Sequence, residues 1–445
     1  MNAHRASRTR ARIGLVAVLL AVTGASASRA EDAPPVAPPA AAPTPPAIPD
    51  PAEPEPYGRT PDALVPHKGA GAPASRFFLT PPTYRGPGAD DPEPADVTEV
   101  RFGVLAPLSG VDAPIGRRIV DGYTLAIEDA NAAGGLRPGV PFRLLPADEN
   151  DTWGAAGNAL VELTTHRGCL AVLGALDDQN SHVMTRVLLK LNVPMVNTGG
   201  TDPTLTEHMI PWLVRLRPDD RQAAYLLARR IFLEANHQRV VFFRGTDRYA
   251  RQGVGELADA ARRLGRPVAL EVRYGPDDTT FKKQVERIQE VKPDAVVMWG
   301  RPAATGRALA ALRAAGVTVP VYGPDRLVDA DFLAAAGAAA EGITLTSPLD
   351  PTRTDAAWTT FRDRFAARFG YAPDHHAATA YDGAAYLVAA TRRAGLNRVR
   401  VRAALFEPAT YAGVAGDVRF DVNHNDVRAL SIVRVKDGAF VYGAP

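Results

Sequence analysis

From about residue 99 onward, the chain alternates short apolar runs with helical segments, and this alternation constrains the fold more than any other feature. The first run, 100–106, is apolar at most positions, as strands buried on both faces of a parallel sheet are. The helix predicted at 115–131 is followed by Gly134 and Gly135, where glycine can adopt the left-handed conformation of a helix stop. Strands and helices in this alternation predict right-handed βαβ units and parallel sheets.

The same alternation begins again with a helix predicted at 222–234. The strands predicted after the first cover residues 142–147, 170–174, 194–196, 239–243, 268–272, 295–299, 320–322 and 342–346. Two such runs predict an α/β fold with two doubly wound parallel-sheet lobes. Ligands of open α/β sheets bind outside the carboxyl ends of the strands, so the loops after the strands are the candidate binding region.

The composition of the chain excludes several classes of protein. Its 445 residues are 46% hydrophobic and 22% charged, which rules out disorder throughout and an integral membrane protein. Beyond residue 30 the chain has 46 basic against 49 acidic residues and no Lys/Arg block, so no nucleic-acid partner is predicted. The single cysteine, Cys169, excludes an intrachain disulfide and cysteine-based zinc or iron–sulfur sites.

The sequence predicts neither a metal, nor a cofactor, nor an enzyme. The acidic run 148–151 lacks the spacing of a calcium loop, and His375 and His376 are adjacent rather than on one helical face. The chain contains neither a G-x-S-x-G motif nor a nucleotide P-loop. An unrecognised catalytic set of Ser and Asp residues stays open as an alternative.

The N-terminal residues predict export rather than folded structure. Residues 1–30 combine an arginine-rich start, an apolar run of about ten residues at 13–22 and small residues, which is the layout of a secretory signal peptide. The apolar run is too short to span a membrane, so no membrane insertion is expected after cleavage. Residues 31–98 are rich in Pro and Ala and predict an extended, disordered linker, either a spacer or a dispensable leader.

The loops after the predicted strands contain short motifs whose combination is typical of a known protein family. The stretches concerned are 103–110 with Gly116, 121–128, 131–135, 193–194, 201–206, 215–220, 322–325, 340–342 and 380–382. In this order and spacing they resemble the type I periplasmic solute-binding proteins of the branched-chain amino-acid (Leu/Ile/Val) ABC transporter family. The resemblance covers nearly all of residues 99–445.

The resemblance implies an exported periplasmic protein that captures a small polar solute, an amino acid or a related molecule, by hinge closure for the permease subunits of an ABC importer. It implies that lobe 1 comprises 99–216 and 349–410, and lobe 2 comprises 217–348 and 411–445, joined by a three-stranded hinge. A ligand-binding sensor subunit that serves a receptor or an associated enzyme system is the alternative. The Pro-rich spacer and the altered site favour that alternative slightly.

The resemblance also assigns a carboxylate-binding loop in lobe 1 to Gly199, Gly200 and Thr201. Glycines allow backbone N–H groups to approach an anion, and a threonine hydroxyl can donate as well. Asp178 stands where the family has a serine that contacts the ligand, and a carboxylate there would repel a ligand carboxylate. Either Ser181 or Asn180 replaces that serine, or the ligand lacks the usual amino-acid head group, or Asp177 and Asp178 merely open the next helix.

From lobe 2, the resemblance places Tyr249 in the cleft and assigns Asp325 to the ligand ammonium group. Arg301, in a loop that departs from the family pattern, would suit an extra anionic group on the ligand. Ile115 and His376 fall at positions of side-chain pocket residues. An exposed Arg301 and a structural His376 are the alternatives.

Overall fold

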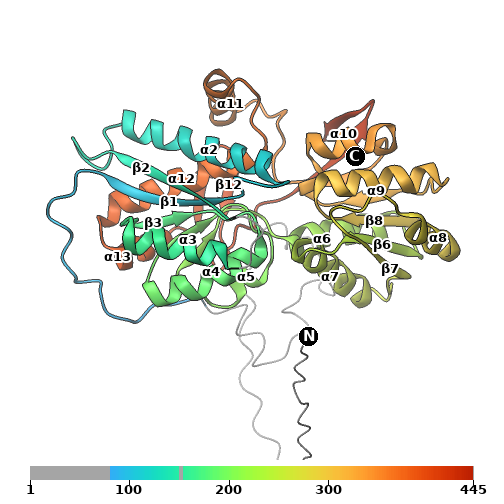
Figure 1. Ribbon diagram of the computed structural model, residues 1–445, viewed down its shortest axis with the longest axis horizontal. Helices are drawn as coiled ribbons and strands as arrows, with labels where there is room; N and C mark the ends of the chain where they lie inside the picture. Colours follow the sequence, from blue (N-terminus) through green and yellow to red (C-terminus); the bar gives the residue numbers. More distant parts are fainter. Residues whose placement is uncertain (1–80, 150–153, 444–445) are drawn as a thin grey trace, which may run out of the picture. The chain divides into compact units, whose positions relative to one another are not determined.

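The structure, a computed structural model, describes residues 81–149 and 154–443. The predicted signal peptide and most of the predicted linker lie outside these residues. Within the described residues, no helix is both long enough and apolar enough to span a bilayer. Two β-sheets with separate apolar cores organise this part of the chain (Figure 1). The α/β fold with parallel-sheet lobes is confirmed.

The first sheet has five parallel strands in the order β2-β1-β3-β4-β5. The strands are β1 (Val100–Ala106), β2 (Phe142–Asp148), β3 (Ala171–Leu173), β4 (Met195–Asn197) and β5 (Leu213–Arg215). The helices of this lobe are α2 (Ala113–Ala132), α3 (Ala155–Val161) with its π-helical continuation Glu162–His166, α4 (Asp178–Leu191), α5 (Thr204–Glu207), α11 (Ala356–Phe369), α12 (His375–Ala394) and α13 (Arg398–Leu405).

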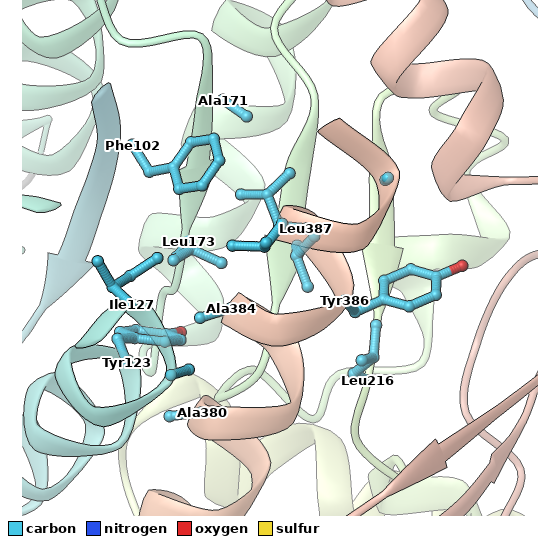
Figure 2. Close-up of a cluster of buried hydrophobic side chains, with 14 of the residues drawn as sticks. Phe102, Tyr123, Ile127, Ala171, Leu173, Leu216, Ala380, Ala384, Tyr386 and Leu387 are labelled. Carbon is cyan, nitrogen blue, oxygen red and sulfur yellow. The ribbon is translucent and has the colours of Figure 1, made fainter. Parts of the chain in front are cut away.

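Helices α2 and α12 pack against each other over one face of this sheet. Figure 2 shows Tyr123 of α2 beside Ala384 of α12, in one buried cluster with Phe102 and Leu173 of the sheet and Leu387 of α12. Leu105, which lies in the same strand as Phe102, instead points to the opposite face of the sheet and packs with residues of α3 and α4. Alternation of buried side chains between two covered faces is why these strands are apolar at almost every position.

The second sheet has seven strands in the order β14-β13-β10-β9-β8-β6-β7. Its parallel strands are β6 (Val240–Gly245), β7 (Leu270–Tyr274), β8 (Ala295–Trp299), β9 (Val321–Gly323) and β10 (Thr344–Ser347), and β13 (Ser431–Lys436) and β14 (Ala439–Tyr442) add two antiparallel strands. The helices are α6 (Asp220–Ala228) continuing as Arg229–Glu234, α7 (Arg248–Arg263), α8 (Lys282–Val291), α9 (Pro302–Ala314), the 3-10 turn η6 (Asp325–Leu327), and α10 (Ala330–Ala336) with Gly337–Ala340.

The C-terminal part of the chain differs from the expectation that residues 411–445 belong to lobe 2. The hairpin of β11 (Thr410–Gly413) and β12 (Gly416–Arg419) buries Val418 in the core of the first sheet, with Phe420 directly after it. The Asp382 carboxylate of α12 accepts hydrogen bonds from the backbone N–H groups that join the two strands. The chain enters the second sheet only at β13, because apolar side chains keep the hairpin on the first core.

The described part of the predicted linker also differs from the expectation of an unpacked segment. The Tyr84 ring packs edge-on against buried Trp212, with 4.7 Å between the ring centroids. Arg402 of α13 donates a hydrogen bond to the carbonyl oxygen of buried Pro82. Residues 81–98 therefore lie against the first lobe, and the predicted linker includes a stretch with tertiary contacts.

Candidate solute-binding cleft

The loop after β3 places an acidic side chain at the start of α4. Asp177 caps this helix by accepting a hydrogen bond from the Asn180 N–H, and Asp178 is its first residue. The Asp178 carboxylate is fully buried, and its Oδ1 accepts hydrogen bonds from the backbone N–H groups of Thr201 at 2.8 Å and Asp202 at 3.1 Å. Asp178 thus both opens the helix and binds the loop after β4.

The glycines of this loop allow it to approach its neighbours closely. A Cβ atom on Gly199 would lie only 2.6 Å from the carbonyl oxygen of Ala175, so glycine is required there, whereas one on Gly200 would lie 3.0 Å from Asp178 Oδ1. The Gly200 N–H donates to the Asn197 side chain at 2.9 Å. The three consecutive N–H groups of residues 200–202 therefore all have acceptors within the protein.

The two residues proposed to replace the missing serine are engaged elsewhere. The Ser181 hydroxyl donates to the Asp177 carbonyl at 2.9 Å, and the Asn180 amide donates to the Glu149 carbonyl at 2.6 Å. Glu149 is itself buried, and burial raises the pKa of its carboxyl well above the usual value.

Thr201 joins this loop to the first helix of the second lobe. Its carbonyl oxygen accepts a hydrogen bond from the Asp220 N–H at 2.8 Å, while its buried hydroxyl has no hydrogen-bond partner among the described residues. Neither carboxylate oxygen of Asp220 has a hydrogen-bond partner of acceptable geometry there, although the Thr201 hydroxyl is close enough to lower its pKa. Burial, followed by the charges of Asp178 and Asp325, nevertheless raises the pKa of Asp220 well above its usual value.

The structure pairs Asp325 with an internal cation. The Arg217 guanidinium donates to Asp325 Oδ2, and its other terminal nitrogen lies 3.2 Å from His376 Nδ1. Burial opposes ionisation of Asp325, but the charge and hydrogen bond of Arg217, with the charges of His375 and Arg326, together outweigh it and hold the pKa of this carboxyl below its ordinary value. His376 is buried, and burial lowers its pKa well below the usual value, so at neutral pH it is an uncharged neighbour of Arg217.

Arg326 fills the space above Tyr249. Its guanidinium carbon lies 3.7 Å from the centroid of the Tyr249 ring, which is a cation–π contact. One terminal nitrogen donates a long hydrogen bond of 3.4 Å to the carbonyl oxygen of Leu176 in the other lobe, and Nε has no partner among the described residues. The Tyr249 hydroxyl is also buried without a partner there.

Ile115 and Arg301 lie beside this cluster. Arg301 pairs with Asp112 at 3.4 Å and directly precedes α9. Together with Ile115 it lines a cavity of about 120 Å³. A smaller cavity of about 20 Å³ adjoins Tyr249 and Arg326.

The sequence patterns therefore indicate part of the cluster and not the rest. The residues they indicate, and which the structure brings together, are Asp178, Thr201, Tyr249, Asp325 and His376. They predict no role for the remaining charged members, which are Arg217, Asp220 and Arg326. The first two lie within the recognised stretch 215–220, and Arg326 directly follows Asp325, so the position in the motifs was the available signal.

The chain has two parallel-sheet lobes, and buried polar groups from both lobes meet at the ends of the strands. This arrangement is typical of two-lobed solute-binding proteins. Residues 99–439 match the model of the periplasmic binding protein family, and the chain belongs to that family. Members of this family bind solutes rather than catalyse reactions, so the chain is a solute-binding protein.

Curated relatives and solved structures agree with this assignment. The chain is 27% identical over 269 residues to "Leu/Ile/Val-binding protein homolog 3" of Brucella melitensis biotype 1, covering 59% of this chain and 71% of the relative. It is 25% identical over 307 residues to "Amino acid binding protein" of Pseudomonas aeruginosa, covering 68% and 80%. A leucine-binding protein from Thermotoga maritima shares the fold with a TM-score of 0.72 at 21% identity, covering 78% of this chain and 98% of that one. A solute-binding protein from R. palustris in complex with benzoate has a TM-score of 0.70 at 21% identity, with 78% and 96% covered.

Proposed function

We propose that this chain is the periplasmic solute-binding subunit of an ABC importer and that its ligand binds in the cluster formed by Asp178, Thr201, Asp220, Tyr249 and Arg326. Family membership supports the transport role over the sensing alternative. The observation that carries the site is a set of buried polar atoms, on side chains from both lobes, that have no hydrogen-bond partner within residues 81–149 and 154–443. Unsatisfied buried polar atoms are rare in stable cores, and a ligand between the lobes would satisfy them.

Hinge closure is the proposed mechanism. Contacts such as Asp220 N–H to the Thr201 carbonyl, and Arg326 to the Leu176 carbonyl, join the lobes and exist only when the lobes are together. A ligand that adds further contacts of this kind shifts the population toward the closed form, which permease subunits can then recognise.

A thermal-shift screen of small polar solutes tests this function. A ligand that binds only the folded protein raises the unfolding temperature as its concentration increases. Small-angle scattering with the best hit should show a more compact particle than without it. If no solute from amino acids, amides, amines and small acids raises the unfolding temperature, the proposed function is wrong.

A further inference from the structure

The loop assigned to a ligand carboxylate already binds a carboxylate of the protein. The N–H groups of Thr201 and Asp202 both donate to Asp178 Oδ1, and that of Gly200 donates to Asn197. Because an N–H group forms one good hydrogen bond at a time, these three donors are not available to a second anion. A ligand carboxylate at this loop would also face the buried charge of Asp178 without a donor between them. Asp178 therefore takes the place of a ligand carboxylate.

Several buried atoms of the cluster have no hydrogen-bond partner of acceptable geometry among the described residues. The acceptors among them are Oδ2 of Asp178 and both oxygens of Asp220, and the donors are Nε of Arg217 and Nε of Arg326. The hydroxyls of Thr201 and Tyr249, also buried and without partners, lie in the same cluster and can donate or accept. An ammonium or guanidinium group supplies several N–H donors and no acceptor, which matches the oxygens of Asp178 and Asp220 and the two hydroxyls, although not the two arginine Nε atoms.

The charges of the cluster point the same way. Three carboxylates, those of Asp178, Asp220 and Asp325, interact with two guanidinium groups, those of Arg217 and Arg326. Burial raises the pKa of Asp178 and of Asp220, so with one carboxyl protonated the five groups carry no net charge. If all five are ionised they carry one excess negative charge, which a monovalent cation balances. Buried charges are stable only when they are paired, so a bound cation would stabilise the ionised carboxylates.

Arg326 shows that the face of Tyr249 suits a cation. Its guanidinium lies 3.7 Å above the ring, and Asp178 and Asp220 both favour its charged form. The adjoining cavity of about 20 Å³ has room for about one water molecule. A ligand must therefore enter while the lobes are apart, and Arg326 must move away from Tyr249 to make room for it.

We infer that this chain binds a small organic cation without a carboxylate group, an amine or a guanidine, and that Asp178 and Asp220 hold its charged head beside Tyr249. The inference rests on the proposed solute-binding function and names the ligand class for that site. It excludes ordinary α-amino acids, because Asp178 occupies the N–H groups and Arg217 occupies Asp325.

Calorimetric titration with four probes tests this inference. The probes are propylamine and methylguanidine as cations, propionate as an anion, and L-leucine as an amino acid. The unmodified protein should bind at least one cation and neither carboxylate. Asp220→Asn should weaken cation binding by at least about tenfold, since it removes the carboxylate that has the fewest hydrogen-bond and ion-pair partners within the protein. Asp178→Ser should free two N–H groups and allow propionate or L-leucine to bind at least about tenfold more tightly.

Asp437→Asn is the matched control, because it makes the same change of charge at an exposed turn between β13 and β14 and should leave every affinity unchanged. Binding of L-leucine or propionate to the unmodified protein would overturn the inference while leaving the solute-binding function intact. Failure of both cations to bind would also overturn it. The measurements on the unmodified protein decide the question even if a variant does not fold. The proposed function fails separately, only if the wider solute screen finds no ligand.

Discussion

Two arginines of the hinge region, Arg215 and Arg217, lie two residues apart and are both almost fully buried, but their surroundings differ. Each nitrogen of the Arg215 guanidinium group donates a hydrogen bond, to acceptors that include Asp219 at 2.9 Å and Asn425 at 2.6 Å. Arg217 contacts Asp325 and His376, and its Nε has no partner among the described residues. One network is complete and the other is not.

The neighbouring aspartates repeat this contrast. Asp219 accepts hydrogen bonds from Arg215, Asn425 and the Gln222 N–H, and it forms a capping box with Gln222. Asp220, the next residue, faces the cluster with neither oxygen bonded in an acceptable geometry. A fully satisfied buried network holds one arrangement, whereas a partly satisfied one leaves buried polar atoms without partners. In the proposed hinge closure, we expect the first network to stay constant and the second to change its partners.

The largest expected effect is a difference in protein stability between alanine variants of the two arginines. Arg215→Ala leaves Asp219 and Asn425 buried without their partner and should lower the free energy of unfolding by about 3–5 kcal/mol. Arg217→Ala should lower it by less than about 2 kcal/mol, because separation of the lobes lets water reach Asp325. Urea unfolding of both variants measures the difference, and equal losses would contradict the comparison.

The next effect depends on pH. Burial raises the pKa of Asp178 to about 6, with Arg326 opposing and Asp202 and Asp177 adding to the rise, while Asp220 faces it across the cluster. Because this pKa lies above the unfolded value of about 3.9, the folded state binds more protons, and stability falls as pH rises from about 4 to 6. Asp178→Asn keeps an acceptor for the two N–H groups and should remove as much as about 3 kcal/mol of that fall. Unfolding curves at pH 4 and 6.5 measure it; an identical pH dependence of the two proteins would show that Asp178 does not titrate in the cleft.

A smaller effect is chemical rescue. Arg326→Ala should leave a space above Tyr249, and methylguanidine can enter it if the lobes separate as proposed. At concentrations well above its dissociation constant, the added cation should restore about 1 kcal/mol of stability. The same cation should not rescue Arg215→Ala, whose network has no route for exchange. Thermal unfolding with and without methylguanidine measures this, and rescue of Arg215→Ala instead would refute the distinction between the two networks.

The smallest effect concerns a partly exposed ion pair that also joins the two lobes. Arg118 of α2 donates to Asp329 at 2.7 Å, and its side chain is 22% exposed. Solvent weakens such a pair, so Arg118→Ala should change stability by less than about 1 kcal/mol and the change should shrink in 0.5 M salt. A larger, salt-independent loss would mean that the pair belongs to the buried network.

Much of the fold could be predicted because its signals are local. The apolar run 100–106 forms β1 as predicted, and residues 295–299 form β8, since strands buried on both faces are recognisable by composition alone. The packing of residues 81–98 against the first lobe could not be predicted, because proline content indicates backbone stiffness and not tertiary contacts. Nothing in the local sequence around Tyr84 indicates that its ring meets Trp212, more than a hundred residues later.

The sequence by itself determined the alternation of strands and helices, the family, and the loops in which Asp178, Thr201, Tyr249 and Asp325 lie. Only the tertiary structure decided what those residues bind. Asp178 accepts from Thr201, 23 residues away, and Arg217 pairs with Asp325, 108 residues away. The residue types alone are compatible with a ligand carboxylate and a ligand ammonium group at these positions. Hydrogen bonds and ion pairs depend on distances of a few ångströms between side chains. The packing of the sheets and helices sets those distances, and it gives both positions a partner from within the chain.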